Sequence, residues 1–245
     1  MKKRYAISDI HGNAYQFLKL LDYVDPDPEE LVILGDFINR GLDSWGVVEE
    51  IDQLIDEGCT VLMGNHEDAH MKASLNQINV DDYLTGDFMG ITTVQSFKLA
   101  SERLGKDVVH NKMQKIIGEL RMYHETDDFI FVLGGIDPRL PYMYMQKTDV
   151  LLYGCKDWKN PTMQHSFDQY IVFGHTPTFN IHRNISEKEP TVWMSHRAKK
   201  IAIDTGAGLG RRLTMVDLYD GIAYAYDFSK RDIIEYPFKR KERHR

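Results

Sequence analysis

The first 63 residues alternate short apolar runs with longer amphipathic stretches, and this pattern constrains the fold more than any other feature of the sequence. Apolar runs occupy residues 4–8, 31–34 and 60–63, and amphipathic stretches at 14–24 and 44–57 separate them. Strands that alternate with helices form βαβ units, whose right-handed crossovers connect neighbouring parallel strands. The N-terminal part is therefore predicted to be α/β with a parallel sheet.

The rest of the chain shows two further patterns. From residue 67 to about 125 the strand signal fades, and residues 112–124 place Met113, Ile116 and Leu120 on one helical face, so a helical insertion is predicted over 67–125. Strands are predicted at 129–133, 170–173, 200–203, 213–218 and 222–226, and Asp220-Gly221 predicts a hairpin between the last two. Without a repeat or linker, a single domain over 1–245 is favoured.

Composition limits the class of protein. The 245 residues include 42% hydrophobic and 27% charged side chains, which is typical of a globular protein with a substantial core. The net charge of −7 opposes binding to nucleic acid or to an anionic membrane, and no apolar run approaches a membrane span. Cys59 and Cys155 lack metal-cage spacing, so free thiols and a cytoplasmic location are expected. The basic tail at 239–245 is expected to be a solvated end.

Acidic, histidine and asparagine residues follow the three N-terminal apolar runs. Asp9 and His11 follow the first run, Asp36 follows the second, and Asn65 and His66 follow the third. Ligands bind at the carboxyl ends of the strands in open α/β sheets, so these side chains are expected at one edge. The sequence therefore predicts a functional site there.

The same pattern recurs later in the chain. His175 follows the run at 170–173, and Asp204 follows the run at 200–203. Carboxylates and imidazoles together suit divalent transition ions, and one aspartate can bridge two ions that clamp a phosphoryl group. Arg40 adds a guanidinium fork that matches phosphate oxygens. Hydrolysis of a phosphoester is the chemistry that this set indicates.

Each of these residues also fits a structural role when it is taken alone. Asp9 or Asp36 can cap a helix, and His175 can be a hydrogen-bonded core histidine. Polar residues are common at strand ends. Three consecutive strand ends with ligand-type residues nevertheless favour a metal site over coincidence.

The motifs, read together, carry a family resemblance. The chain contains SDIHGN, GDFINRG, GNHE, VLGGIDP, FGHTP and IDTGAGLGRRLTMVDL, in this order between residues 8 and 218. This series resembles the metallophosphoesterase (calcineurin-like) superfamily, and within it the bacterial and phage serine/threonine phosphatases and the symmetrical diadenosine tetraphosphate hydrolases. The resemblance implies a four-layer α/β/β/α sandwich with the helical insertion described above.

The resemblance also implies a dinuclear metal centre. Asp9, His11 and Asp36 match the ligands of a first ion, with Asp36 bridging, and Asn65 and His175 match the ligands of a second. Manganese is the ion expected first, with iron, zinc or nickel as alternatives.

Three residues, one of them also a metal ligand, match positions that act on the substrate. Arg40 and Asn65 would hold the substrate phosphate, and His66 would protonate the leaving oxygen.

Three departures from the family pattern bear on activity. Leu133 stands where the family usually has a histidine ligand, so the second ion is expected to bind more weakly. Asn39 replaces the aspartate that orients the acid histidine, and a neutral amide is expected to accept the hydrogen bond without supplying charge. Cys155 occupies a position where relatives have arginine, for which Lys156 or Arg139 is expected to compensate.

Three functions remain open at this point. The leading hypothesis is a phosphomonoesterase for a phosphorylated protein, at phosphoserine or phosphothreonine, or for a small phosphoester, acting by in-line attack of a metal-bound hydroxide. A diadenosine tetraphosphate-type hydrolase is the first alternative, because an anhydride has a better leaving group and depends less on an acid. A catalytically impaired regulatory protein that binds metal or phosphate is the second, on the evidence of Leu133 and Asn39.

Overall fold

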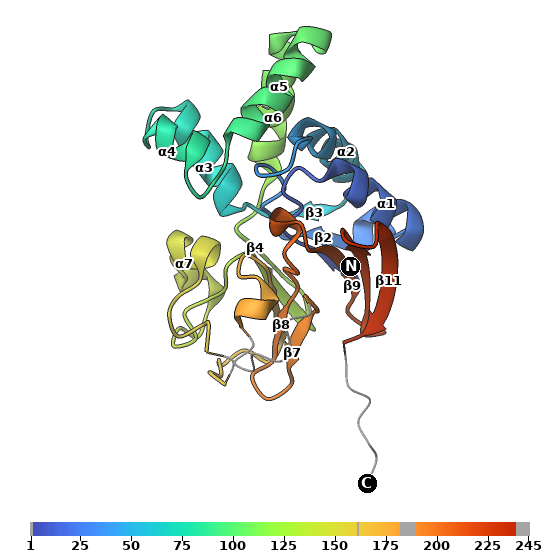
Figure 1. Cartoon of the computed structure of the whole chain (residues 1–245). Helices are drawn as coiled ribbons and strands as arrows, with labels where there is room; N and C mark the ends of the chain where they lie inside the picture. The colour runs from blue at the N-terminus through green and yellow to red at the C-terminus, as the bar shows by residue number, and fades with distance from the viewer. Residues whose placement is uncertain (1, 161, 182–189, 239–245) are drawn as a thin grey trace.

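The computed structural model describes residues 2–160, 162–181 and 190–238, and it contains two β-sheets that pack face to face (Figure 1). The first sheet has the order β11-β10-β9-β1-β2-β3. Its strands are β1 (Tyr5–Ile7), β2 (Leu31–Ile33), β3 (Thr60–Val61), β9 (Arg212–Asp217), β10 (Ile222–Asp227) and β11 (Asp232–Pro237). β1, β2 and β3 are parallel, as the alternating pattern predicts, and β9 pairs antiparallel with β1.

The second sheet has the order β4-β5-β6-β8-β7. Its strands are β4 (Tyr123–Glu125), β5 (Phe129–Val132), β6 (Tyr170–Phe173), β7 (Trp193–Ser195) and β8 (Lys200–Ala202). β5, β6 and β8 run parallel, whereas the edge strands β4 and β7 are antiparallel to their neighbours. Strands β4, β7 and β11 lie at sheet edges and were not predicted from the sequence.

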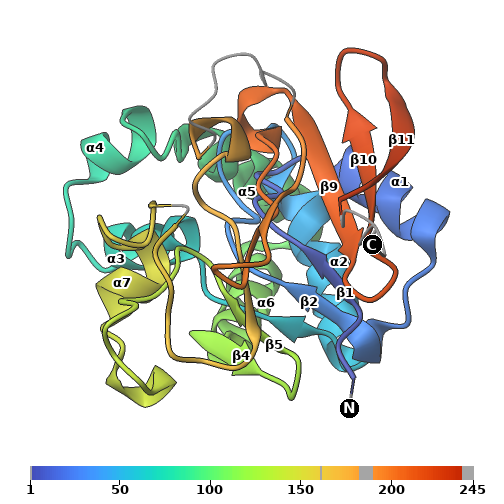
Figure 2. The same cartoon turned by 90° about the horizontal axis from the view of Figure 1, so that it is seen from below.

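Seven α-helices connect and cover these sheets within the described residues. They are α1 (Ala14–Val24), α2 (Ser44–Asp56), α3 (Asn65–Ser74), α4 (Val80–Thr85), α5 (Ile91–Leu104), α6 (Lys106–Glu119) and α7 (Thr148–Tyr153). Figures 1 and 2 show α3, α4 and α7 on the side of the molecule away from β10 and β11.

Three apolar clusters hold the layers together. Side chains such as Val32 and Phe131 fill the space between the sheets. The outer face of the first sheet packs against α1, α2 and α6 through residues such as Phe17 and Ile51. The outer face of the second sheet is covered by α7 and by irregular chain around Trp158. The predicted four-layer α/β/β/α architecture is confirmed, although one outer layer is mostly irregular.

The predicted helical segment at 112–124 is wrong at its C-terminal end. Helix α6 ends at Glu119, Leu120 is extended, and β4 pairs with β5 from Tyr123 onward. Backbone pairing with the free edge of β5 holds this segment as a strand, and a long-range partner of this kind leaves no trace in the local helical period. The helices of the predicted insertion thus run from α3 to α6, over residues 65–119.

No helix in the described ranges combines the length and the apolar character that a membrane span requires. The basic tail at 239–245 lies outside the described residues.

Candidate metal and phosphate site

The backbone takes an unusual conformation where the strands of both sheets end. Six predicted site residues have positive φ angles between 48° and 70°: Asp9, His11, Asp36, Asn39, Arg40 and His175. This left-handed region is costly for residues other than glycine, and it persists only where the surrounding structure enforces it. Such strain concentrates at functional sites, and here it lies where the sequence analysis placed the chemistry.

The buried carboxylate of Glu67 holds the loop after β2. Its Oε2 accepts hydrogen bonds from the backbone N–H groups of Asp36 (2.8 Å) and Gly64 (3.0 Å), and its Oε1 accepts from Phe37 (2.9 Å) and Ile38 (3.1 Å). Burial and the charge of Asp36 raise the pKa of Glu67 to about 8, and the backbone donors oppose this rise. Four donors facing two oxygens are satisfied only by the ionised form. Glu67 therefore fixes the backbone that carries Asp36.

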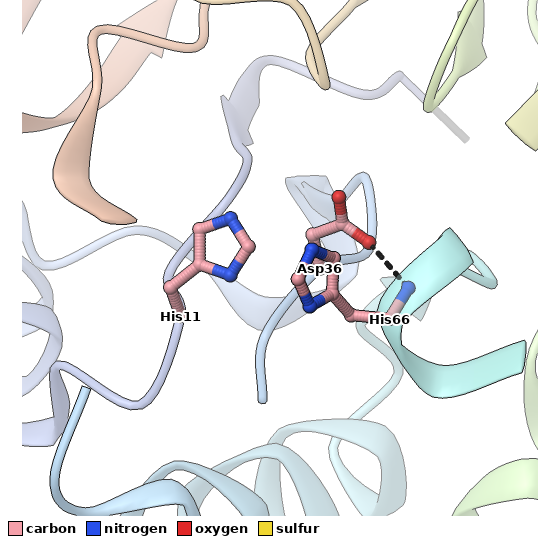
Figure 3. A group of neighbouring side chains, drawn as sticks. All are labelled: His11, Asp36 and His66. Atoms are coloured by element: carbon pink, nitrogen blue, oxygen red, sulfur yellow. Dashed lines mark hydrogen bonds between the residues drawn. The ribbon is translucent and has the colours of Figure 1, made fainter. Parts of the chain in front are cut away.

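Three buried side chains converge at the ends of β1, β2 and β3 (Figure 3). One potential ligand atom from each of His11, Asp36 and His66 lies within 4.8 Å of the others. The backbone N–H of His66 donates to Asp36 Oδ1 at 3.0 Å, and the two imidazole rings are 4.6 Å apart between centroids. His11 Nδ1 lies 3.2 Å from the carbonyl oxygen of Ile38, which leaves Nε2 available to a metal ion.

Two more predicted ligands join this group. Asp9 Oδ1 lies 3.8 Å from His11 Nε2, and His175 Nδ1 lies 3.8 Å from Asp36 Oδ2. The backbone N–H of His175 donates to Asp9 Oδ2 at 2.9 Å, so the loop after β6 contacts the loop after β1. The structure thus brings ligand-type residues from both sheets to one place.

The charges of this site fit bound cations. Burial and the carboxylates of Asp204 and Asp36 hold the pKa of Asp9 well above its usual range, and burial raises the pKa of Asp204 to about 6. Both shifts reflect negative charge gathered away from water, which a divalent ion would offset. Asn65 Oδ1 is buried and has no hydrogen-bond partner among the described residues, as expected of an oxygen reserved for a ligand. The donor set therefore fits divalent metal ions.

The contact between Asn39 and His66 differs from the expectation. The amide oxygen of Asn39 accepts from the hydroxyls of Tyr83 (3.0 Å) and Thr93 (2.8 Å), and its Nδ2 lies 3.0 Å from His66 Nδ1. An amide nitrogen can only donate, so His66 Nδ1 is the acceptor, and the expected acceptor role of the amide is wrong. Burial, aided by Arg40, lowers the pKa of His66 to about 4.

A cleft of about 770 Å³ opens above these side chains. Arg40 lines it, and within the described ranges its guanidinium has no hydrogen-bond or ion-pair partner, so it is free to bind an anion. The remaining wall is largely apolar. It includes Phe88, Met89, Tyr153 and Leu209.

Three residues discussed with the family pattern lie elsewhere. Arg139 forms a bidentate pair with Asp137 at 2.7 and 2.8 Å, and neither it nor Lys156 lines the cleft. Leu133 is fully buried at the end of β5.

Asp204 and Glu67 are site residues that the sequence analysis did not assign. Asp204 was visible as a strand-end carboxylate, and Glu67 belongs to the GNHE motif. The hydrogen bonds of Glu67 with the backbone and the proximity of Asp204 to Asp9 become visible only in the folded chain.

Comparison with known proteins identifies the family. Residues 3–189 match the model of the calcineurin-like phosphoesterase family. The chain belongs to this family. Its members hydrolyse phosphate compounds with divalent metal ions, so this phosphoesterase is a metal-dependent phosphate hydrolase.

Relatives of this phosphoesterase include named tetraphosphatases. A bis(5'-nucleosyl)-tetraphosphatase PrpE (asymmetrical) from Anoxybacillus flavithermus is 27% identical over 85% of this chain and 87% of that protein. A symmetrical bis(5'-nucleosyl)-tetraphosphatase from Nitrosomonas europaea is 28% identical over 55% of this chain and 45% of that protein. Among solved structures, a cold-active protein-tyrosine phosphatase from Shewanella aligns with a TM-score of 0.61 at 17% identity, covering 98% of this chain and 81% of that one. At this identity the structural match shows a shared fold alone.

Proposed function

We propose that this phosphoesterase hydrolyses a phosphoanhydride bond of a dinucleoside polyphosphate. The observation that carries the proposal is the hydrogen bond from Asn39 Nδ2 to His66 Nδ1. A general acid is most needed when the departing oxygen is strongly basic, as the alkoxide of serine or threonine is. A departing phosphate is a far weaker base, so an anhydride is the substrate that this histidine serves best.

The other site residues would bind either the metal ions or the substrate. Asp9, His11, Asp36, Asn65 and His175 would hold two divalent ions, with manganese proposed first and the second ion bound more weakly for want of a ligand at position 133. Such ions neutralise phosphoryl charge and lower the pKa of a coordinated water.

The chain's own groups would orient the substrate. Arg40 would hold a phosphoryl oxygen through its guanidinium fork, with Asn65 beside it. The apolar wall at Phe88, Met89 and Leu209 would receive a nucleoside and exclude water from its base. The name of the Anoxybacillus relative, which aligns along most of both chains, supports this substrate class.

A phosphomonoester, at phosphoserine or phosphothreonine of a protein, is the second candidate. Arg40 is the one arginine or lysine among the described residues that line the cleft. One guanidinium matches one phosphoryl group, whereas a tetraphosphate carries further charges that metal ions would have to neutralise.

Turnover on matched substrates tests the proposal. The manganese-loaded protein would be assayed on diadenosine tetraphosphate, on a phosphoserine peptide and on p-nitrophenyl phosphate, with Asp36→Asn as the inactive control. We expect kcat/KM to be highest for the tetraphosphate. Faster hydrolysis of the phosphopeptide would select the second candidate, and equal turnover by Asp36→Asn would remove the assigned site altogether.

A further inference from the structure

A second pocket lies outside the metal cleft, between α3, α5 and α6. Its volume is about 520 Å³, and its apolar walls include Met71, Phe97, Val109, Met113 and Ile117. We call it the insertion pocket, because all three helices belong to the predicted helical insertion. It is large enough for a small organic molecule.

The insertion pocket is lined by one lysine and by no acidic residue among those described. Lys106, His70 and His110 line it, and none of the described lining residues is acidic. Lys106 has no ion-pair partner among the described residues, so its ammonium is available to an occupant. The complementary ligand has an apolar body and an anionic group.

His70 connects this pocket to the metal cleft. Its ring lines the pocket, and its Nδ1 lies 2.8 Å from the hydroxyl of Tyr83. Tyr83 donates to Asn39 Oδ1 at 3.0 Å, and Asn39 Nδ2 donates to His66 Nδ1 at 3.0 Å. A continuous chain of three hydrogen bonds therefore joins the two sites.

The single proton of the Tyr83 hydroxyl makes this chain sensitive to an occupant. Burial lowers the pKa of His70 to about 4, so the ring is neutral and carries one proton. Tyr83 can donate to Asn39 only while His70 Nδ1 holds that proton and donates to Tyr83. An anionic oxygen beside Nε2 favours the other tautomer, which draws the Tyr83 proton toward His70 and weakens the support of Asn39.

We propose that the insertion pocket binds a small molecule with an apolar body and one anionic group, and that the occupant lowers turnover through His70, Tyr83 and Asn39. This role goes beyond the proposed hydrolysis. The pocket is separate from the metal cleft, because the two share none of the residues described as lining them.

The aromatic sulfonate 8-anilinonaphthalene-1-sulfonate is a suitable probe, since its fluorescence rises in apolar sites. With the full-length manganese-loaded protein we expect saturable binding and a fall of about 3-fold in kcat for the phosphoserine peptide, whose leaving group depends most on His66, which is the effect of weakening one hydrogen bond. The uncharged analogue N-phenyl-1-naphthylamine should bind more weakly. Absence of saturable binding would overturn the proposal without any bearing on the substrate.

Gly118→Trp tests the location. Gly118 lines the pocket, and a Cβ there would meet no heavy atom within 4 Å, so the helix can carry an indole at the pocket wall and still fold. We expect probe binding to weaken at least about 10-fold with basal turnover unchanged. Unchanged probe binding would overturn the assignment, as would a dimer that this substitution abolishes in sedimentation, because a second copy would then be the occupant.

Two further variants test the charge and the coupling. Lys106→Gln should weaken probe binding about 3-fold or more, whereas Lys98→Gln, an exposed position on α5 outside the pocket, should not. Tyr83→Phe should still bind the probe but lose the probe-dependent fall in kcat. Equal inhibition of Tyr83→Phe and the unmodified protein would refute the hydrogen-bond route.

Discussion

Glu67→Gln is expected to lower both the stability of the protein and its affinity for metal ions. The carboxylate of Glu67 satisfies four buried backbone donors, two on each oxygen. Glutamine is almost the same size, but its amide nitrogen Nε2 can only donate, so one of the two acceptor atoms is lost. Whichever way the amide turns, two backbone N–H groups of the loop after β2 or of Gly64 lose their acceptor.

The expected loss of stability follows from the two backbone N–H groups that are left without an acceptor. Each unsatisfied buried group costs about 1–3 kcal/mol, so the free energy of unfolding should fall by roughly 2–6 kcal/mol. One of the affected residues is Asp36 or a neighbour that positions it, so manganese affinity should fall about 10-fold or more, as it does when a partner that orients a metal ligand is removed.

Denaturant unfolding without metal and calorimetric titration with manganese would measure the two effects separately. Glu102→Gln, at an exposed position on α5, removes the same charge without these contacts and should change stability by less than about 0.5 kcal/mol. If Glu67→Gln lowered stability by no more than this control and bound manganese equally well, the role assigned to the carboxylate would be incorrect.

Three other substitutions give measurable expectations. Asn39→Asp places a carboxylate at His66 Nδ1, which should raise turnover of a phosphoserine peptide about 10-fold relative to diadenosine tetraphosphate; an unchanged ratio of the two kcat/KM values would contradict the proposed role of the amide. Leu133→His should lower the melting temperature of the metal-free protein, because a buried imidazole lacks a partner, and should increase the stabilisation by manganese; calorimetry showing no gain in manganese affinity would argue against a second ion beside position 133. Burial lowers the pKa of Lys200 to about 8, so the unfolded chain binds more protons than the folded chain between pH 8 and 10.5, and stability rises with pH in that window. The difference in unfolding free energy between the native protein and Lys200→Met should therefore grow by about 1 kcal/mol per pH unit there, and a flat difference would show that Lys200 titrates normally.

The sequence by itself determined the α/β start of the chain and, through the family motifs, the layered fold. The period of the apolar residues predicted β1, α1, β2, α2 and β3 nearly to the residue, because amphipathic helices and buried strands have different repeats. The residues that follow these strands had to meet at one edge, since parallel strands end on the same side. Local pattern was therefore sufficient for the three parallel strands of the first sheet and for the residues that follow them.

Only the tertiary structure decided how those residues interact. The strands β4, β7 and β11 are edge strands, whose formation depends on pairing with a distant neighbour and leaves a weak local signal. The sequence shows an asparagine at position 39, but the direction of its hydrogen bond to His66 is set by Tyr83 and Thr93, which lie more than forty residues away. Contacts over such separations depend on how helices pack, and no local repeat encodes them.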